Sequence, residues 1–307
     1  METGELLSRI ETALSPQPSP SLEEVLAEIG RRGVVTGGLN RVLQGYKIYV
    51  SYVAEKMAEL AQQHGKQLRE VSSRLFEVLK EAEFAAEDLL KALAERIRKG
   101  DPPGDDVRVW QYEGRWFYFL KLRGVRVSFH FPNVLSTALR ELEPFQIGWR
   151  ASDETVVRGM AAMGTTQMWQ VFAWLAVRPG DVHIEIKGLN LTKRGISPMF
   201  FVTSVNWRQR LGKIEAIRHT IEAFKQGEYR PLLTWWLGDG SVKWSFVEKR
   251  HYKLRIALAK ELKHELSQML PSYVEAGENY IYISGGKKLF VELVKAAGIY
   301  GKLLDVL

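Results

Sequence analysis

The chain has 307 residues, of which 46% are hydrophobic and 26% charged, a composition typical of a globular protein long enough for two or three domains. It contains no cysteine, which excludes disulfides, thiolate zinc sites and thiol nucleophiles, and none of its six histidines belongs to an HxxxH or HExxH pair. No apolar run reaches the roughly 20 residues that a membrane span needs, and the N-terminus lacks a secretory pattern, so we expect a cytoplasmic protein.

The net charge of +7 is concentrated toward the C-terminus. Residues 1–100 carry 14 basic and 15 acidic side chains, residues 101–200 carry 12 and 10, and residues 201–307 carry 17 and 11. This excess predicts a polyanionic partner for the last third of the chain. A solvated basic surface of the kind found in thermophile proteins is the alternative.

Residues 1–100 have helical periodicity. Apolar residues recur at helical spacing in "SLEEVLAEIGRRG", from Asn40 to His64, and in the long stretch that ends at Gly100. We expect a helical hairpin packed on its own leucines, or a dimerisation element. The segment "DPPGDD" at 101–106 is predicted to be a linker.

Residues 107–205 are predicted to form an α+β segment, to which the sequence assigns no role. The stretch "VRVWQYEGRWFYFLKLRGVRVSFHF" alternates and has glycines where tight turns would fall, which indicates a three-stranded meander. The elements expected after it are helices near 133–142 and 166–177 and strands around 181–187 and 199–204. Its aromatic residues form a base-stacking surface or, more commonly, pack a small sheet; they are Tyr112, Trp116, Tyr118 and Phe129.

The last hundred residues have the clearest pattern. A helix is expected at 213–225, and Pro231 occupies the favoured first position of a second helix, 231–238. The strands "VKWSFV" and "YKLRIAL" each have one apolar and one basic face. A helix at 259–270, the hairpin "SYVEAGENYIYIS" and a final helix from about 287 follow. The predicted order is αββαββα.

This order, together with "LLTWWLGDGS", resembles the LAGLIDADG homing endonucleases, whose signature helix ends in an acidic residue followed by glycine. The resemblance covers residues 213–307 and includes the leading pair Leu232-Leu233 and the acidic end Asp239-Gly240. It implies a DNA-binding protein that cleaves duplex DNA with Mg²⁺. The expected fold is therefore α+β, with a helical region at 1–100, the α+β segment at 107–205 and a LAGLIDADG-like domain at 210–307.

The resemblance also assigns roles to individual residues. Thr234 and Gly238 are the small residues through which two such helices would pair, although the family usually has glycine at the first of them. Asp239 is the expected catalytic carboxylate and metal ligand, with help from the Gly238 carbonyl, because Mg²⁺ prefers oxygen ligands. Lys287 and Lys288 match the position of the family's catalytic basic residue after the fourth strand.

The basic strand face is expected to lie in the major groove of DNA or along its phosphates. The DNA-binding residues predicted in this way are Lys243, Ser245, Lys249, Arg250, Lys253, Arg255, Tyr280 and Tyr282.

A nuclease of this family needs two motifs for each active site. The stretch "VVRGMAAMGTT" at 156–166 has small residues but no acid in the matching position, which leaves a single motif and predicts a homodimer that uses Asp239 twice. Two alternatives remain open: a catalytically inactive, LAGLIDADG-derived DNA-binding or regulatory protein, and a structural or interaction protein of a mobile-element-like archaeal family.

Overall fold

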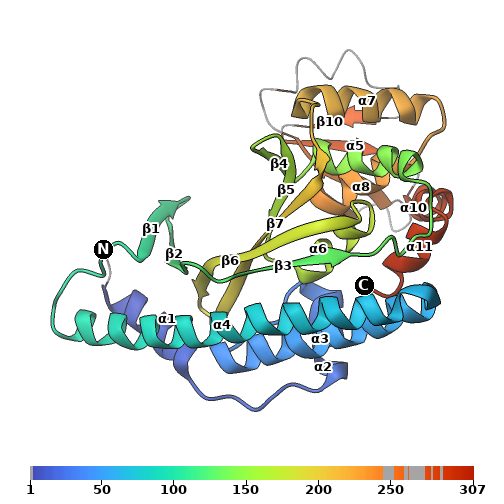
Figure 1. The fold of residues 1–307 in the computed structure, drawn as a ribbon. Helices are drawn as coiled ribbons and strands as arrows, with labels where there is room; N and C mark the ends of the chain where they lie inside the picture. The colour runs from blue at the N-terminus through green and yellow to red at the C-terminus, as the bar shows by residue number, and fades with distance from the viewer. Residues whose placement is uncertain (1–2, 245–251, 259–261, 263–273, 278, 284–285) are drawn as a thin grey trace. The chain divides into compact units, whose positions relative to one another are not determined.

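The computed structural model describes residues 3–244, 252–258, 262, 274–277, 279–283 and 286–307 (Figure 1). The described residues form helices only up to Arg98 and both helices and strands after it, which agrees with the predicted α+β class. The chain forms two compact units, each discontinuous in sequence. Unit 1 comprises residues 1–132, 164–171 and 181–203, and unit 2 comprises residues 133–163, 172–180 and 204–307. The segment predicted as a linker, 101–106, lies within unit 1 and contains no helix or strand.

The N-terminal helices belong to unit 1. They are α1 (Thr3–Leu14), α2 (Leu22–Arg32), α3 (Leu39–Leu60), the 3-10 helix η1 (Gln62–His64) and α4 (Gly65–Arg98). Helix α2 begins with a capping box between Ser21 and Glu24 and ends at Gly33, whose φ of 74° favours glycine. Helices α3 and α4 lie side by side and bury apolar residues such as Tyr46 and Leu79, as the predicted helical hairpin requires (Figure 1).

The strands after α4 do not form the predicted meander. Strands β1 (Val107–Tyr112) and β2 (Arg115–Lys121) make a hairpin, but β3 (Arg126–Phe131) pairs with β6 (Gly180–Thr192) rather than with β2. Strand β6 has 13 residues, long enough to pair with β2 near its end and with β3 before it. The three-stranded meander is therefore a wrong prediction, because a long partner strand competes successfully with local pairing.

The helix expected near 133–142 is also displaced. The structure has a 3-10 helix, η2 (Leu139–Leu142), followed by helix α5 (Glu143–Ala151), in which Pro144 lies in the first turn, where proline is well tolerated. The later strands and helices are β4 (Glu154–Val157), β5 (Met160–Thr165), α6 (Met168–Ala176), β7 (Gly195–Arg208), α7 (Lys213–Lys225), α8 (Arg230–Asp239), β8 (Gly240–Trp244), β9 (Tyr252–Ala257), β10 (Val274–Ala276), β11 (Tyr280–Ile283), α10 (Gly286–Ala296) and α11 (Ile299–Leu304). The helix predicted at 259–270 lies outside the described residues.

The two sheets repeat one strand order. The larger sheet runs β1-β2-β6-β7-β5-β4, with β3 also on β6, and the smaller runs β10-β11-β9-β8. In β4–β7 and in β8–β11 alike, the third strand pairs with the fourth, the fourth with the second and the second with the first. Helix α5 precedes one set of strands and α8 the other. The chain thus contains two segments of matching topology, and the sequence predicted the order of the strands in the second.

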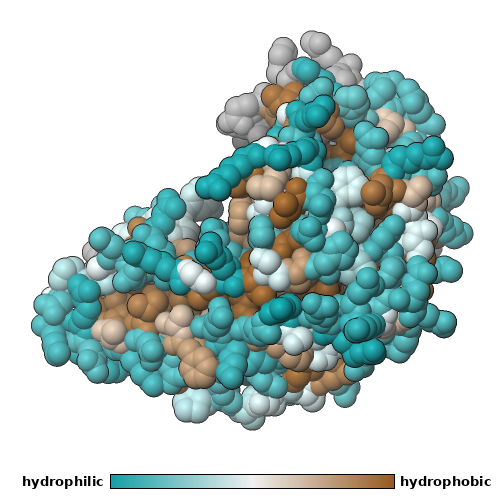
Figure 2. Space-filling model, in the orientation of Figure 1, coloured by the Kyte–Doolittle hydropathy of each residue, from teal (hydrophilic) through white to brown (hydrophobic). Residues whose placement is uncertain are grey.

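The visible face of the molecule is mostly hydrophilic, with smaller apolar areas between the polar side chains (Figure 2). No helix in the described part of the chain combines the length and the apolar character that a membrane span requires.

Candidate functional site at the ends of two paired helices

Helices α5 and α8, both in unit 2, pack against each other at very short range. A Cβ atom added to Gly148 of α5 would lie 1.9 Å from the Pro231 carbonyl oxygen and 2.2 Å from Thr234 Oγ1 of α8. Thr234 is fully buried and its hydroxyl donates a hydrogen bond to the Phe145 carbonyl oxygen of α5, at 2.8 Å. The absence of a side chain at Gly148 is therefore what allows the two backbones to approach.

The same close approach continues to the ends of the helices. A Cβ atom on Gly238 would lie 2.3 Å from Ser152 Oγ and 3.4 Å from Asp153 Oδ2. Since Asp239 follows Gly238 directly, Asp153 and Asp239 come together where the two helices end. Helix C-termini carry partial negative charge, so two of them and two carboxylates make a strong attractor for a cation.

The electrostatics of this acidic pair are unusual. Partial burial raises the pKa of the Asp239 carboxyl to about 6; the nearby charge of Lys213 opposes this rise and that of Asp153 adds to it. Partial burial also raises the pKa of Asp153, again against Lys213. The ionised forms of both carboxyls are therefore disfavoured, and a bound cation would stabilise them.

A buried donor lies beside Asp239. The indole of Trp235 is almost fully buried, and its Nε1 makes no hydrogen bond of regular geometry to any described residue. It lies close enough to Asp239 to favour the ionised carboxylate. Because this N–H favours the ionised form of the neighbouring carboxyl, it adds to the preference for negatively charged or oxygen-rich atoms at the helix ends.

We predict that Asp239→Asn stabilises the protein in the absence of divalent cations. The folded pKa of about 6 exceeds the ordinary value of 3.8, so the folded state loses stability as pH rises from about 4 through 6, and this loss is complete above. The variant should be about 1–2 kcal/mol more stable than wild type at pH 8, after allowance for solvent screening. The difference should disappear near pH 4.

Thermal unfolding between pH 4 and pH 8 measures this effect. Asp88→Asn, which alters an exposed carboxyl on α4, is the matched control and should leave the melting temperature unchanged. Equal melting curves for Asp239→Asn and wild type at pH 8 would contradict the prediction.

Lys213, at the start of α7, is the cation whose charge acts on both carboxyls, and the sequence had not suggested it. Lys288, which the resemblance predicts to be catalytic, is exposed at the beginning of α10. Lys287 belongs to the same helix, but its side chain lies outside the described part of the structure.

The predicted DNA-binding face follows the register of the smaller sheet. Lys243 is the strand partner of Lys253, and Ser241 that of Arg255, so these positions share one face. The other face is apolar and buried, as shown by Ile256. Three of the predicted DNA-binding residues lie outside the described residues: Ser245, Lys249 and Arg250.

Arg255 is in contact with an aromatic pair on the same sheet. Its guanidinium lies 4.1 Å from the centre of the Tyr280 ring, and Tyr282 is its partner across the strands. The rings of Tyr280 and Tyr282 are 6.3 Å apart. All three side chains are half-buried, and the structure brings them into one cluster.

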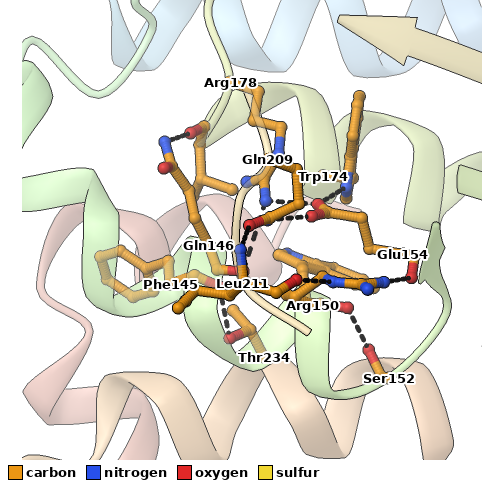
Figure 3. A network of polar contacts seen from close by, with 12 residues as sticks. Phe145, Gln146, Arg150, Ser152, Glu154, Trp174, Arg178, Gln209, Leu211 and Thr234 are labelled. Atoms are coloured by element: carbon orange, nitrogen blue, oxygen red, sulfur yellow. Dashed lines mark hydrogen bonds and ion pairs between the residues drawn. The ribbon is translucent and has the colours of Figure 1, made fainter. Parts of the chain in front are cut away.

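A buried polar network fixes the end of α5 (Figure 3). Glu154, the residue after Asp153, forms an ion pair with Arg178, and both side chains are almost completely buried. Trp174 Nε1 donates to Glu154 at 2.9 Å and Gln209 Nε2 at 2.6 Å. This network anchors the backbone that carries Asp153.

Arg150 ties the same turn to the chain before α7. Its Nη1 donates to the Glu154 carbonyl oxygen at 2.7 Å and its Nε to the Leu211 carbonyl oxygen at 2.8 Å (Figure 3). Leu211 lies two residues before Lys213, so one arginine connects the segments that carry Asp153 and Lys213.

We predict that Gly148→Ala destabilises unit 2 by about 3 kcal/mol, because the new methyl group would meet backbone of α8 that cannot move aside. Gly30→Ala is the matched control, since this helical glycine has open space around it and should become slightly more stable, by about 0.5–1 kcal/mol. Urea unfolding of both variants measures the two effects. If Gly148→Ala were as stable as wild type, the close contact of the helices would be disproved.

Asp153 is the site residue that sequence reasoning missed. The run Gly148-Trp149 followed by Ser152-Asp153 has the same spacing as Thr234-Trp235 followed by Gly238-Asp239. A small residue, a tryptophan, a second small residue and an aspartate therefore recur in both helices. The stretch at 156–166, which resembles a second motif but lacks an acid, begins three residues after Asp153.

Comparison of the chain with protein-family models, curated proteins and solved structures finds no match. Within the described residues, no cluster of three or more His, Asp or Glu side chains could hold a metal ion. The donors available at the helix ends are the two carboxylates and nearby carbonyl oxygens, so function is inferred from their geometry.

Proposed function

We propose that the chain is a LAGLIDADG-type DNA-binding protein that cleaves duplex DNA with Mg²⁺ at a site formed by Asp153 and Asp239. The observation that carries the proposal is the close pairing of α5 and α8, which brings two carboxylates together at their ends. The repeated strand order supports it, because α5 and α8 are each followed by two pairs of strands, the order of strands expected of one LAGLIDADG unit.

The residues at the helix ends fit a magnesium ion. Mg²⁺ is commonly bound by one or two carboxylates, with the remaining ligands supplied by water and substrate phosphates, so a cluster of three protein ligands is not required. The raised pKa values of both carboxyls mean that a bound cation would be strongly stabilising. The Gly238 carbonyl, next to Asp239, would be the further protein ligand.

The chemistry proposed is hydrolysis of a phosphodiester. Bound Mg²⁺ would supply positive charge that stabilises the charge developing on the scissile phosphate. Asp153 and Asp239 would hold the ion, and Lys213 would donate to a phosphate oxygen beside them. The oxygen of a water molecule would form the new bond to phosphorus while the bond between phosphorus and the sugar oxygen breaks, and the proton lost by the water would pass to the departing sugar oxygen.

In this proposal the site is complete within one chain. The single motif identified in the sequence required a homodimer in which Asp239 is used twice. The position of Asp153 supports a monomeric nuclease instead, with the segments 143–208 and 230–296 in the roles of two subunits. The target would then need no palindromic symmetry, because the two segments differ in sequence.

The proposal is tested by incubating the purified chain with a randomised duplex DNA library in Mg²⁺ or EDTA and sequencing the cleaved ends. We expect Mg²⁺-dependent cleavage at a preferred sequence by a protein that sediments as a monomer. Binding of the library without cleavage would support the alternative of an inactive DNA-binding protein on the same scaffold. Neither binding nor cleavage would remove both and leave a structural or interaction role.

A further inference from the structure

The β1–β2 hairpin of unit 1 has an exposed face made of aromatic and arginine side chains. Its register pairs Arg108 with Phe119, Trp110 with Phe117 and Tyr112 with Arg115. Residues directly opposite each other in an antiparallel pair share a face, and so do every second residue of each strand. One face therefore carries four aromatic rings and two guanidinium groups; the residues on it are Arg108, Trp110, Tyr112, Arg115, Phe117 and Phe119.

This aromatic face, as we call these six residues, is unusually open to solvent. Tyr112 is 62% exposed, Phe117 38% and Trp110 37%. The rings of Trp110 and Phe117 are stacked, with centres 5.5 Å apart and planes only 13° from parallel, and the Arg108 guanidinium lies 5.7 Å from the Trp110 ring. Among the described strands, β1 is at the edge of its sheet and pairs only with β2 (Figure 1).

A groove with a net positive lining, the basic groove, adjoins the aromatic face. Its volume is about 1050 Å³, and Arg115 and Phe117 belong to both features. Its charged lining residues are Arg9, Arg115, Lys193 and Glu5, of which Glu5 is ion-paired with Arg9. Arg9 holds the walls of the groove together. Its side chain donates hydrogen bonds to the carbonyl oxygens of Trp116 and Leu191 and so connects α1 to β2 and β6. The groove therefore exists before any ligand binds.

The positive charge extends beyond this groove. A neighbouring cavity of about 440 Å³ shares Lys193 with it and adds Arg32 and Arg194. Loss of hydration and the nearby charges of Arg194 and Arg31 lower the pKa of Arg32. Like charges held this close favour a bound anion, and their succession from Arg115 through Lys193 to Arg194 favours a polyanion.

We propose that the aromatic face and the basic groove of unit 1 bind single-stranded nucleic acid. Bases would stack on Trp110 and Phe117, whose rings are exposed and already parallel to each other, and the phosphates would follow Arg115, Lys193 and Arg194. Exposed rings interleaved with cations are the physical requirements of single-strand binding, since every base has a stacking surface and every nucleotide a charge. This activity is separate from duplex cleavage and does not require Asp153 or Asp239.

Fluorescence anisotropy with the full chain and labelled 20-nucleotide oligo(dT), oligo(U) and a 20-base-pair duplex tests the proposal. Trp110→Ala and Phe117→Ala should each weaken binding of a single strand roughly tenfold. Phe84→Ala is the matched control: this ring on α4 is 61% exposed with the Lys80 ammonium 5.9 Å away, but it is not part of the aromatic face. The affinity of Phe84→Ala for the single strands should equal that of the wild-type protein.

Salt dependence provides a second measurement. Lys193→Gln should lower the slope of log affinity against log salt by about 0.7, the value for one lost phosphate contact on a single strand. Preference for oligo(dT) or oligo(U) would identify the sugar that is recognised, and either supports the proposal. Circular dichroism of each variant verifies that the fold is retained.

Three results would overturn the inference: no binding of either single strand, binding that Trp110→Ala and Phe117→Ala leave unchanged, or binding of the duplex alone. Loss of self-association in these variants, without oligonucleotide binding by wild type, would identify the face as a protein interface instead. Because none of these measurements involves cleavage, their failure is distinct from failure of the proposed nuclease.

Discussion

Asp153→Asn should abolish Mg²⁺-dependent cleavage as completely as Asp239→Asn. Each substitution removes one of the two negative charges at the ends of α5 and α8, and with it several kcal/mol of charge stabilisation, so we expect losses of roughly 100- to 1000-fold. The double variant should be no less active than either single variant, because the two carboxylates act as one unit. Rates of cleavage of the selected duplex measure these effects, with Asp88→Asn as the control of unchanged activity.

Mixing the two inactive variants separates a site within one chain from a site shared by two chains. If Asp153 and Asp239 of one chain form the site, a mixture of Asp153→Asn and Asp239→Asn remains inactive, since every chain lacks one carboxylate. If a homodimer uses Asp239 twice, Asp153→Asn alone stays active. That second result would remove the monomeric nuclease and restore the dimer that the single motif predicted.

The C-terminal half of unit 2 could be predicted in detail because its local pattern is strong. A proline at the start of α8, alternation in β8 and β9 and two isoleucines on one face of β11 each indicate an element without help from distant residues. The roles assigned to Asp239 and Gly238 depended on resemblance and remain a proposal. What the local pattern could not reveal was which helix lies beside α8.

The first half of the acidic pair was missed for a physical reason. Relative to α8, helix α5 has Gln146 and Arg150 at positions held by Leu232 and Trp236, which hides the apolar signature. In the structure Gln146 donates to the Val177 carbonyl oxygen and Arg150 to two carbonyl oxygens of its own surroundings. These polar residues form hydrogen bonds with residues distant in the sequence, and such partners cannot be recognised from the hydrophobic periodicity of the helix. The pairing of β3 with β6 escaped prediction for the same reason.

Glu154→Gln should destabilise unit 2 by about 3–5 kcal/mol, because it leaves the Arg178 guanidinium charged and buried without its partner. The Arg178 guanidinium already lacks hydrogen bonds, because its Nε and Nη1 have no partner among the described residues. Glu87→Gln is the matched control. It removes one half of an exposed ion pair with Lys91 and should change stability by less than about 1 kcal/mol.

A double variant, Glu154→Leu with Arg178→Met, distinguishes the cost of an unpaired buried charge from the cost of an altered side-chain shape. Replacing both partners of a buried pair with apolar side chains removes the desolvation penalty, so the double variant should regain most of the stability that Glu154→Gln loses. Urea unfolding of the three variants and wild type measures this recovery. If the double variant were as unstable as Glu154→Gln, the loss would come from altered shape rather than from the unpaired charge.

The same double variant shows whether the buried pair also serves the acidic site. Glu154 receives hydrogen bonds from Trp174 and Gln209 through its carboxylate, and these orient the backbone immediately after Asp153. With stability restored but those hydrogen bonds gone, we expect cleavage to remain at least tenfold below wild type, since small displacements of a catalytic group are costly. Full recovery of both stability and cleavage would mean that the Glu154–Arg178 pair has only a structural role. Arg150, which donates a hydrogen bond to the Glu154 carbonyl oxygen, would then be the residue that positions Asp153.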